Sequence, residues 1–339
     1  MEKRLLFIFI VAFSSSLFSQ TNEEKINQIV QDGIFLHDKK EYDKAITKYE
    51  EALDIDSKST LVHYELALTY SEKKDYKRAV SHTNKVIKQK TEHLVEAYMV
   101  KGNVLDQQGK TKASIKLFNK AIKETKGHYL LNYNLGINYF KLSQLDEAAN
   151  QFITAINQNK LHGSSHLYLA LAQKRKENLI QSLLPNYYFL LLEPKSDRAL
   201  NAYKLLTESL SGDVSADPVD ANQINIVIDG NADNPYASAE LMIGLLSAAM
   251  QTEENKDVPK EVLFISNSKA ILASLGDLDI PSRDIWTEFY IPFFDKLTSS
   301  EHFETFGNYI LQGANASADK WCLEHPDEVD AFFDWLNEK

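Results

Sequence analysis

Four side chains that carry oxygen have the spacing of a calcium-binding loop. Asp229, Asn231, Asp233 and Glu240 stand at the first, third, fifth and twelfth places of such a loop, where side-chain oxygens converge on a hard cation. The match is incomplete, because Asn234 replaces the glycine of the sharp turn. The alternative is a polar turn in which Asn or Ser caps the next helix. Calcium is the only cofactor that the sequence suggests.

Other reactive side chains lack the context that catalysis needs. His162 and His166 are four residues apart, a spacing that can bind zinc, but no acidic or cysteine ligand is nearby and a role at a helix start is favoured. Cys322 is the only cysteine, and it predicts an inert, partly buried thiol. There is no Ser-His-Asp order and no phosphate-binding glycine loop. The sequence therefore predicts a protein that is not an enzyme.

Small residues recur every 34 or 35 positions in the first half of the chain, and a second small residue follows each of them twelve positions later. The first set is Gly33, Ala67, Gly102, Gly136 and Ala170, and the second is Ala45, Ala79, Ser114, Ala148 and Ser182. This period is typical of stacked helical hairpins, in which paired helices cross closely only where side chains are small. Aromatic residues at fixed offsets are expected to fill the space between successive hairpins.

This pattern resembles the tetratricopeptide repeat over residues 26–194. Five repeats are predicted to begin near Ile26, Thr60, Val95, Tyr129 and Gly163. The resemblance implies an all-α fold, a helical solenoid in which each repeat consists of a helix A and a helix B. Pro185 is expected to kink or restart the last B helix. Residues 196–210 are predicted to form a helix that caps the open end.

The resemblance also implies that a partner lies in a concave groove lined by the A helices. By register, the groove residues are Val30, Ile34, Tyr64, Leu68, Met99, Asn103, Tyr133, Ile137, Leu167 and Leu171. Nearly all are apolar, which suits an apolar helix or an extended peptide as the partner. The alternative is that the C-terminal region of the chain fills this groove. Val30 and Ile34 stand where some family members carry a carboxylate clamp, so that activity is not supported.

The second half of the chain predicts a separate, mostly helical domain. Residues 211–223 are rich in turn formers and predict a linker, and residues 224–228 predict a short strand. Apolar spacing predicts helices over residues 239–250, 260–275, 283–297, 301–311, 318–323 and 327–336. All three tryptophans lie here, and they indicate a compact core more readily than an aromatic ligand pocket.

Charge is divided unevenly along the chain. Residues 20–194 carry 25 basic and 21 acidic side chains, while residues 195–339 carry 10 and 26. The acidic part is expected either to contact the basic repeats or to repel anions, so nucleic acid is disfavoured as a partner. Lys112, Lys116, Lys120 and Lys123 form a stripe that predicts a solvated helix face, with an anionic partner as the alternative.

The first residues predict a secretory signal. Lys3 and Arg4 precede an apolar run over residues 5–13 that is too short to span a bilayer, and cleavage is expected near Ser19. The predicted organisation is a signal over residues 1–19, five repeats with a capping helix over 20–210, a linker over 211–223 and a helical domain over 224–339. The hypothesis is a scaffold or adaptor of a bacterial periplasm or outer envelope, without a transmembrane segment, that binds a protein or peptide. An enzyme or calcium-dependent binder with its site after residue 224 is the alternative.

Overall fold

The computed structural model describes residues 22–211, 214–216, 224–226, 234–250, 252, 255 and 257–337. The chain divides into two compact units, Met1–Asn138 and Tyr139–Lys339, and each is described by itself. No helix in the described ranges is both long and apolar enough to cross a membrane. The domain boundaries expected from the sequence are based on the number of repeats and on the amino-acid composition. They stay a prediction.

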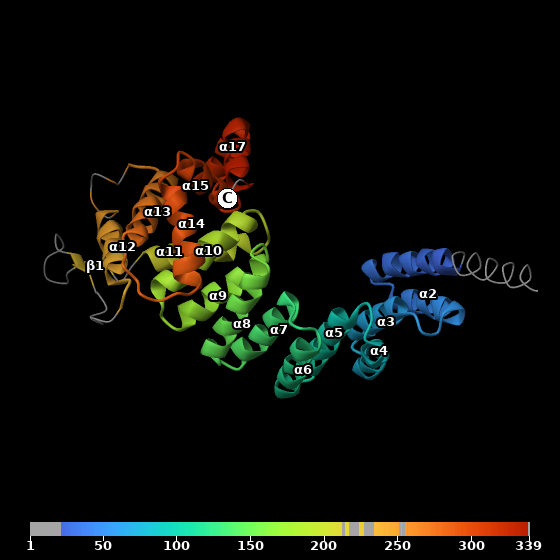
Figure 1. Cartoon of the computed structure of the whole chain (residues 1–339). Helices are drawn as coiled ribbons and strands as arrows, with labels where there is room; N and C mark the ends of the chain where they lie inside the picture. The colour runs from blue at the N-terminus through green and yellow to red at the C-terminus, as the bar shows by residue number, and fades with distance from the viewer. Residues whose placement is uncertain are drawn as a thin grey trace, which may run out of the picture. The chain divides into compact units, whose positions relative to one another are not determined.

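The first unit consists of helical hairpins (Figure 1). An A helix over residues 22–38 is followed by α2, and the next two hairpins pair α3 with α4 and α5 with α6. The last helix, α7, continues past the end of the unit. Their bounds are α2 Tyr42–Ile55, α3 Thr60–Glu72, α4 Tyr76–Gln89, α5 Leu94–Gln107, α6 Thr111–Glu124 and α7 Tyr129–Lys141. The helical fold predicted from the sequence is confirmed, and A helices begin within one residue of the predicted Thr60, Val95 and Tyr129.

Close helix crossings explain the recurring small residues. A Cβ atom added to Gly33 would lie 2.4 Å from the ring of Tyr49, and one added to Gly102 would lie 2.2 Å from the ring of Phe118. Distances this short require the ring to move, and both rings are fully buried. All ten recurring small residues are buried in their units, and the close helix approach inferred from their spacing is confirmed at Gly33 and Gly102.

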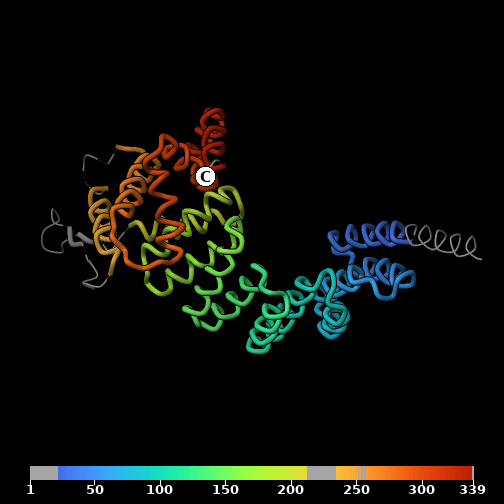
Figure 2. Tube along the Cα trace, viewed as in Figure 1, coloured from blue at the N-terminus to red at the C-terminus, as the bar shows by residue number. Residues whose placement is uncertain are grey.

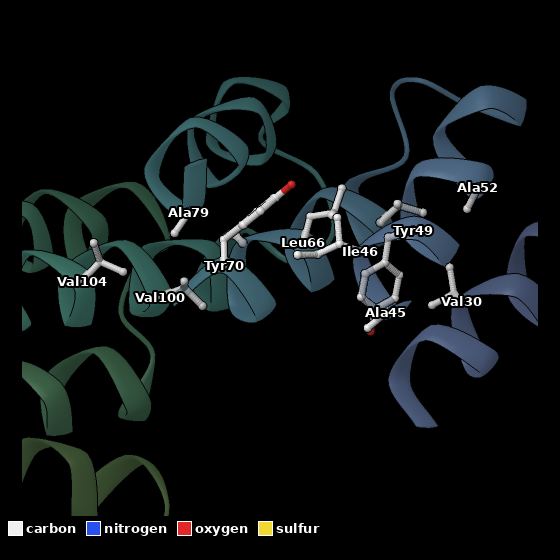
Figure 3. Packing of buried hydrophobic residues seen from close by; sticks show 12 residues of the cluster. Val30, Ala45, Ile46, Tyr49, Ala52, Leu66, Tyr70, Ala79, Val100 and Val104 are labelled. Atoms are coloured by element: carbon white, nitrogen blue, oxygen red, sulfur yellow. The ribbon is translucent and has the colours of Figure 1, made fainter. Parts of the chain in front are cut away.

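The apolar core of the first unit runs along its hairpins. Figure 3 shows Tyr49 of α2 beside Val30 of the first helix, with Leu66 and Tyr70 of α3 continuing the row toward Val100 of α5. These side chains are at most 8% exposed. Since each hairpin leaves part of its apolar face uncovered, the next hairpin is needed to complete the burial.

A buried hydrogen-bond chain links three helices at the end of this unit. The Ser114 hydroxyl of α6 donates to the carbonyl oxygen of Gly102 on α5 at 2.8 Å, and the Asn138 amide of α7 donates to the Ser114 hydroxyl at 2.7 Å. Ser114 thus supplies a hydroxyl where three of the other repeats have alanine.

Replacement of Ser114 is expected to destabilise the first unit. Ser114→Ala leaves the buried Asn138 amide without this acceptor, and an unsatisfied buried polar group costs about 1 to 3 kcal/mol. Urea unfolding followed by circular dichroism measures the loss. Ser81→Ala on the exposed part of α4 is the matched control and should change stability by less than about 0.5 kcal/mol. Equal stability of Ser114→Ala and Ser81→Ala would contradict a stabilising role for these buried hydrogen bonds.

The second unit continues with three further hairpin helices and then folds the C-terminal helices onto them (Figure 2). Helix α8 packs on α9, and α10 contacts α9, α11, α12, α15 and the π-helical turn η2. The bounds are α8 Leu145–Gln158, α9 Gly163–Arg175, α10 Leu179–Leu192, α11 Ala199–Leu210, α12 Ala237–Ala249, α13 Lys260–Gly276, η2 Trp286–Tyr290, α14 Ile291–Thr298, α15 Phe303–Leu311, α16 Ala316–Glu324 and α17 Pro326–Asn337.

Helix α10 differs from the expectation for Pro185. One helix runs from Leu179 to Leu192 with Pro185 inside it, so the predicted restart at this proline is wrong. Residues 182–191 are all buried, and the Tyr187 hydroxyl lies 2.6 Å from the Ser268 hydroxyl of α13. Packing on several sides therefore offsets the hydrogen bond that proline removes.

A two-stranded sheet lies where the sequence predicted a linker and a strand. β1 (Val214–Ala216) pairs antiparallel with β2 (Ile224–Ile226), and Ser215 is opposite Asn225. The predicted strand is confirmed at residues 224–226. The linker expectation missed β1, because three residues carry too little periodicity to predict a strand.

Candidate functional site

The predicted groove residues of the first unit form a partly exposed apolar row on successive A helices. This A-helix row consists of Ile34, Tyr64, Leu68, Met99, Tyr133 and Ile137, all neither buried nor fully exposed, and the exposed Asn103. α3 and α5 contact each other, so the row continues from the second repeat to the third. Val30 differs, because it is fully buried and offers no surface to a partner.

An aromatic stack shapes one point of this row. The rings of Tyr64 on α3 and His93, which precedes α5, are parallel within 4° with centroids 5.5 Å apart. Burial raises the pKa of Tyr64 first, and the nearby carboxylates of Glu65 and Glu96 raise it further. The sequence pattern does not predict His93 at this surface, since His93 lies outside the helical register that identifies the row.

Two histidines lie together behind this surface. The Nδ1 atoms of His63 on α3 and His82 on α4 are 3.1 Å apart, so one imidazole donates and the other accepts. Burial, together with the smaller effects of the neighbouring His63, Lys85 and Arg78, lowers the pKa of His82 to about 4. The pKa of His63 is also lowered, chiefly by burial. Both rings are thus neutral at pH 7 and hold α3 against α4.

The fifth repeat is covered by C-terminal helices of its own unit. The predicted groove residue Leu167 on α9 is only 8% exposed, and Leu171 is partly exposed. Beside Leu167, His166 donates from Nε2 to the carbonyl oxygen of Lys160 at 2.8 Å, because a carbonyl can only accept. Its Nδ1 atom then accepts from the Tyr290 hydroxyl of η2 at 2.6 Å.

An aromatic cluster surrounds this histidine. The His166 ring stacks on Tyr188 of α10 with centroids 4.6 Å apart, and Phe289 of η2 lies 5.1 Å from Tyr188. Burial lowers the pKa of His166 to about 3. Both ring nitrogens of His166 take part in hydrogen bonds, so neither has a free lone pair for a metal. His162 lies at the start of α9, where its Nδ1 atom is 2.8 Å from the Ser165 hydroxyl.

Most of the predicted calcium ligands, namely Asp229, Asn231 and Asp233, lie outside the described residues. Glu240 lies on α12, where its Oε2 atom accepts from the Asn234 amide at 2.7 Å. The Asn234 side chain also accepts from the backbone N–H of Tyr236 at 2.9 Å, as in the alternative of a polar turn before a helix. Calcium binding stays a prediction, which calorimetric titration of the chain and an Asp229→Ala/Asp233→Ala variant would test.

The remaining reactive group is Cys322 on α16. Its side chain is partly buried, and burial raises the pKa of the thiol, while the nearby Lys195 lowers it. A raised pKa reduces the thiolate fraction at pH 7, and the thiolate is the nucleophile. The structure describes no group of three or more potential metal ligands within its described ranges.

Comparison with known proteins agrees with the geometry of the hairpins. Residues 35–74 match the model of the TPR repeat, and residues 61–93 and 95–128 match the model of the tetratricopeptide repeat. The TPR repeat-containing protein MJ1428 of Methanocaldococcus jannaschii is 26% identical over 123 residues, which are 36% of this chain. The chain spans 21% of the length of that relative.

Two solved structures are similar to this chain at low identity. The crystal structure of YrrB, described as a TPR protein with an unusual peptide-binding site, is 22% identical and has a TM-score of 0.38, covering 52% of this chain and 90% of its own. PilF of Pseudomonas aeruginosa is 16% identical with a TM-score of 0.46, covering 56% of this chain and 90% of its own.

Proposed function

Residues 35–128 carry tetratricopeptide repeats, and from this premise we propose that the chain is a non-catalytic scaffold that binds an apolar peptide or helix along the A-helix row. Repeats of this kind serve protein interaction in general. The specific proposal concerns the surface used and the chemistry of the segment that binds there.

The observation that supports this proposal is the partial exposure of large apolar side chains on consecutive A helices. Met99 lies between Tyr64 and Tyr133 in the repeat register, and all three keep part of their surface in solvent. Burial of apolar surface stabilises a complex by roughly 25 cal/mol per Å². The row carries no charged side chain, so a charged segment would lose hydration there without gaining an ion pair.

We also propose that the chain acts after export to a bacterial periplasm or outer envelope. The support is the sequence of residues 1–19, with Lys3 and Arg4 before an apolar run that ends in small residues. These residues lie outside the described part of the chain. N-terminal sequencing of the protein from the cells that make it tests the proposal: an intact Met1 would contradict it.

Charge placed in the A-helix row is expected to weaken peptide binding. A peptide selected against the full chain from a random 12-residue display library serves as the probe, and calorimetry measures its affinity. Met99→Glu with Tyr133→Glu should weaken binding at least tenfold, because each carboxylate must lose its hydration when the peptide covers it.

The matched control places the same charge on a B helix. Asn119→Glu lies on the exposed side of α6 and should leave the affinity within twofold. Circular dichroism verifies that both variants keep their helix content. Undiminished peptide binding by the folded Met99→Glu/Tyr133→Glu variant would show that the A-helix row is not the site.

A further inference from the structure

A dense positive face lies on the B helices of the first unit. Residues 73–126 carry 14 Lys and Arg against 5 Asp and Glu, although the chain as a whole has a net charge of −11. Lysines 112, 116, 120 and 123 follow one side of α6, opposite its buried residues Ser114, Phe118 and Ala121. The side chains of these four lysines are partly or fully exposed, and none lies in the core.

Positive charge is poorly compensated on α6. Lys120 has one exposed ion pair, 3.6 Å from Glu124, and no ion pair joins Lys116 or Lys123 to another described residue. Burial lowers the pKa of Lys101 on neighbouring α5, and Lys120 lowers it further. Like charges one turn apart destabilise a helix by roughly 0.2 to 0.5 kcal/mol per pair. An acidic partner would relieve this repulsion.

An acidic stripe with the complementary spacing occurs on the last helix of the chain. Asp327, Asp330 and Asp334 of α17 are exposed and lie opposite the buried Phe332. No ion pair joins them to another residue in the described ranges. Residues 316–337 carry 6 acidic side chains against Lys320 alone.

The spacings of the two stripes match when the helices are antiparallel. From the C-terminal end of α6, Lys123, Lys120 and Lys116 are separated by three and four residues; from the N-terminal end of α17, Asp327, Asp330 and Asp334 are separated by the same steps. At 1.5 Å per residue, both sets of steps span about 4.5 and 6 Å. The same orientation places the negative end of one helix dipole beside the positive end of the other.

We propose that copies of this chain associate head to tail, with the α6 lysine stripe of one copy against the α17 aspartate stripe of another. The two stripes lie in different units and are not the same surface, so the contact is heterologous and joins copies into rings or open chains. Every copy of the chain carries both stripes, with the same spacing. The partner stripe is therefore present at the concentration of the protein itself. Nothing in this inference depends on occupancy of the A-helix row.

Sedimentation velocity of the full chain between about 1 and 100 µM tests the proposal. At low salt, the average mass should rise with concentration, and 0.5 M NaCl should reverse the rise because exposed charge pairs are screened. Lys116→Glu/Lys120→Glu/Lys123→Glu is expected to weaken association about tenfold. Lys25→Glu/Lys40→Glu/Lys58→Glu changes the net charge equally at exposed sites outside the stripe and should associate like the original chain.

The decisive experiment reverses the charges of each stripe and measures association of the variants alone and mixed. Asp327→Lys/Asp330→Lys/Asp334→Lys alone should also lose association, while an equimolar mixture with the α6 variant should regain it, since each then offers the sign the other lacks. Asp327→Asn/Asp330→Asn/Asp334→Asn serves as a second variant if the lysine changes impair folding.

Two results would overturn the proposal: a chain that stays monomeric at low salt, or a mixture of the two variants that does not reassociate. Binding of phosphatidylglycerol vesicles through the α6 lysines without self-association would also overturn it, and would identify a lipid surface as the occupant.

Discussion

Acidification is expected to destabilise the second unit well before its carboxylates become protonated. The pKa of His166 is lowered to about 3 in the folded chain by burial, against about 6.5 for an unfolded histidine. The unfolded state therefore binds more protons between these values, and the stability that neutral His166 contributes is lost as pH falls through this window. Between pH 6.5 and pH 5 the expected loss is about 1.5 kcal/mol.

Tryptophan fluorescence isolates this effect, because Trp286, Trp321 and Trp335 all lie in the second unit. Urea unfolding at several pH values gives the free energy of unfolding. His166→Phe keeps an aromatic ring but has no site for the proton, so its profile should be flatter over the same range, from a lower starting stability because the Tyr290 hydroxyl loses its acceptor. Equal slopes for the original chain and this variant would contradict the assignment.

Gly102→Leu is expected to destabilise the first unit by about 3 kcal/mol or to unfold its third repeat. A Cβ atom alone would lie 2.2 Å from the fully buried Phe118 ring, and leucine adds three more carbon atoms. Leucine is a good helix former, so a loss of stability would not come from helix propensity. Thermal and urea unfolding by circular dichroism measure the change.

Two further variants locate the cause of this loss. Asn103→Leu introduces the same side chain at the exposed next residue of the same helix and should alter stability by less than about 0.5 kcal/mol. Adding Phe118→Ala to Gly102→Leu should recover part of the stability, because the two side chains compete for one space. Strict additivity of the two changes would contradict a direct clash.

Local patterns predicted most helices of this chain because each one has a periodic apolar face. The predicted helix over residues 260–275 became α13, Lys260–Gly276, and the one over 327–336 became α17, Pro326–Asn337. The helix expected over residues 283–297 differs, since it begins with a π-helical turn in which the Ile291 N–H bonds to the Trp286 carbonyl. Pro292 lies at the start of the following α14.

The same patterns do not predict contacts between residues that are far apart in the sequence. His166 and Tyr290 are 124 residues apart, and neither has a neighbouring signal that names the other. The helix restart expected at Pro185 follows from the local effect of proline alone. The burial of α10 on several sides depends on helices that come later in the chain. For the A-helix row, register predicted partial exposure at Tyr64 and Met99 but not the complete burial of Val30.

The crossing of the paired helices has a consequence for how these repeats can diverge. Sixteen positions after Gly33 and Gly102 stand Tyr49 and Phe118, whereas Ala67 is followed at that distance by the smaller Thr83. A smaller residue at the first position goes with a larger residue sixteen positions later. The two helices of a hairpin therefore fit each other and not the helices of another hairpin. Shuffling a helix from one hairpin into another would create a collision or a void, and mutations at these sites should be tolerated only as compensating pairs.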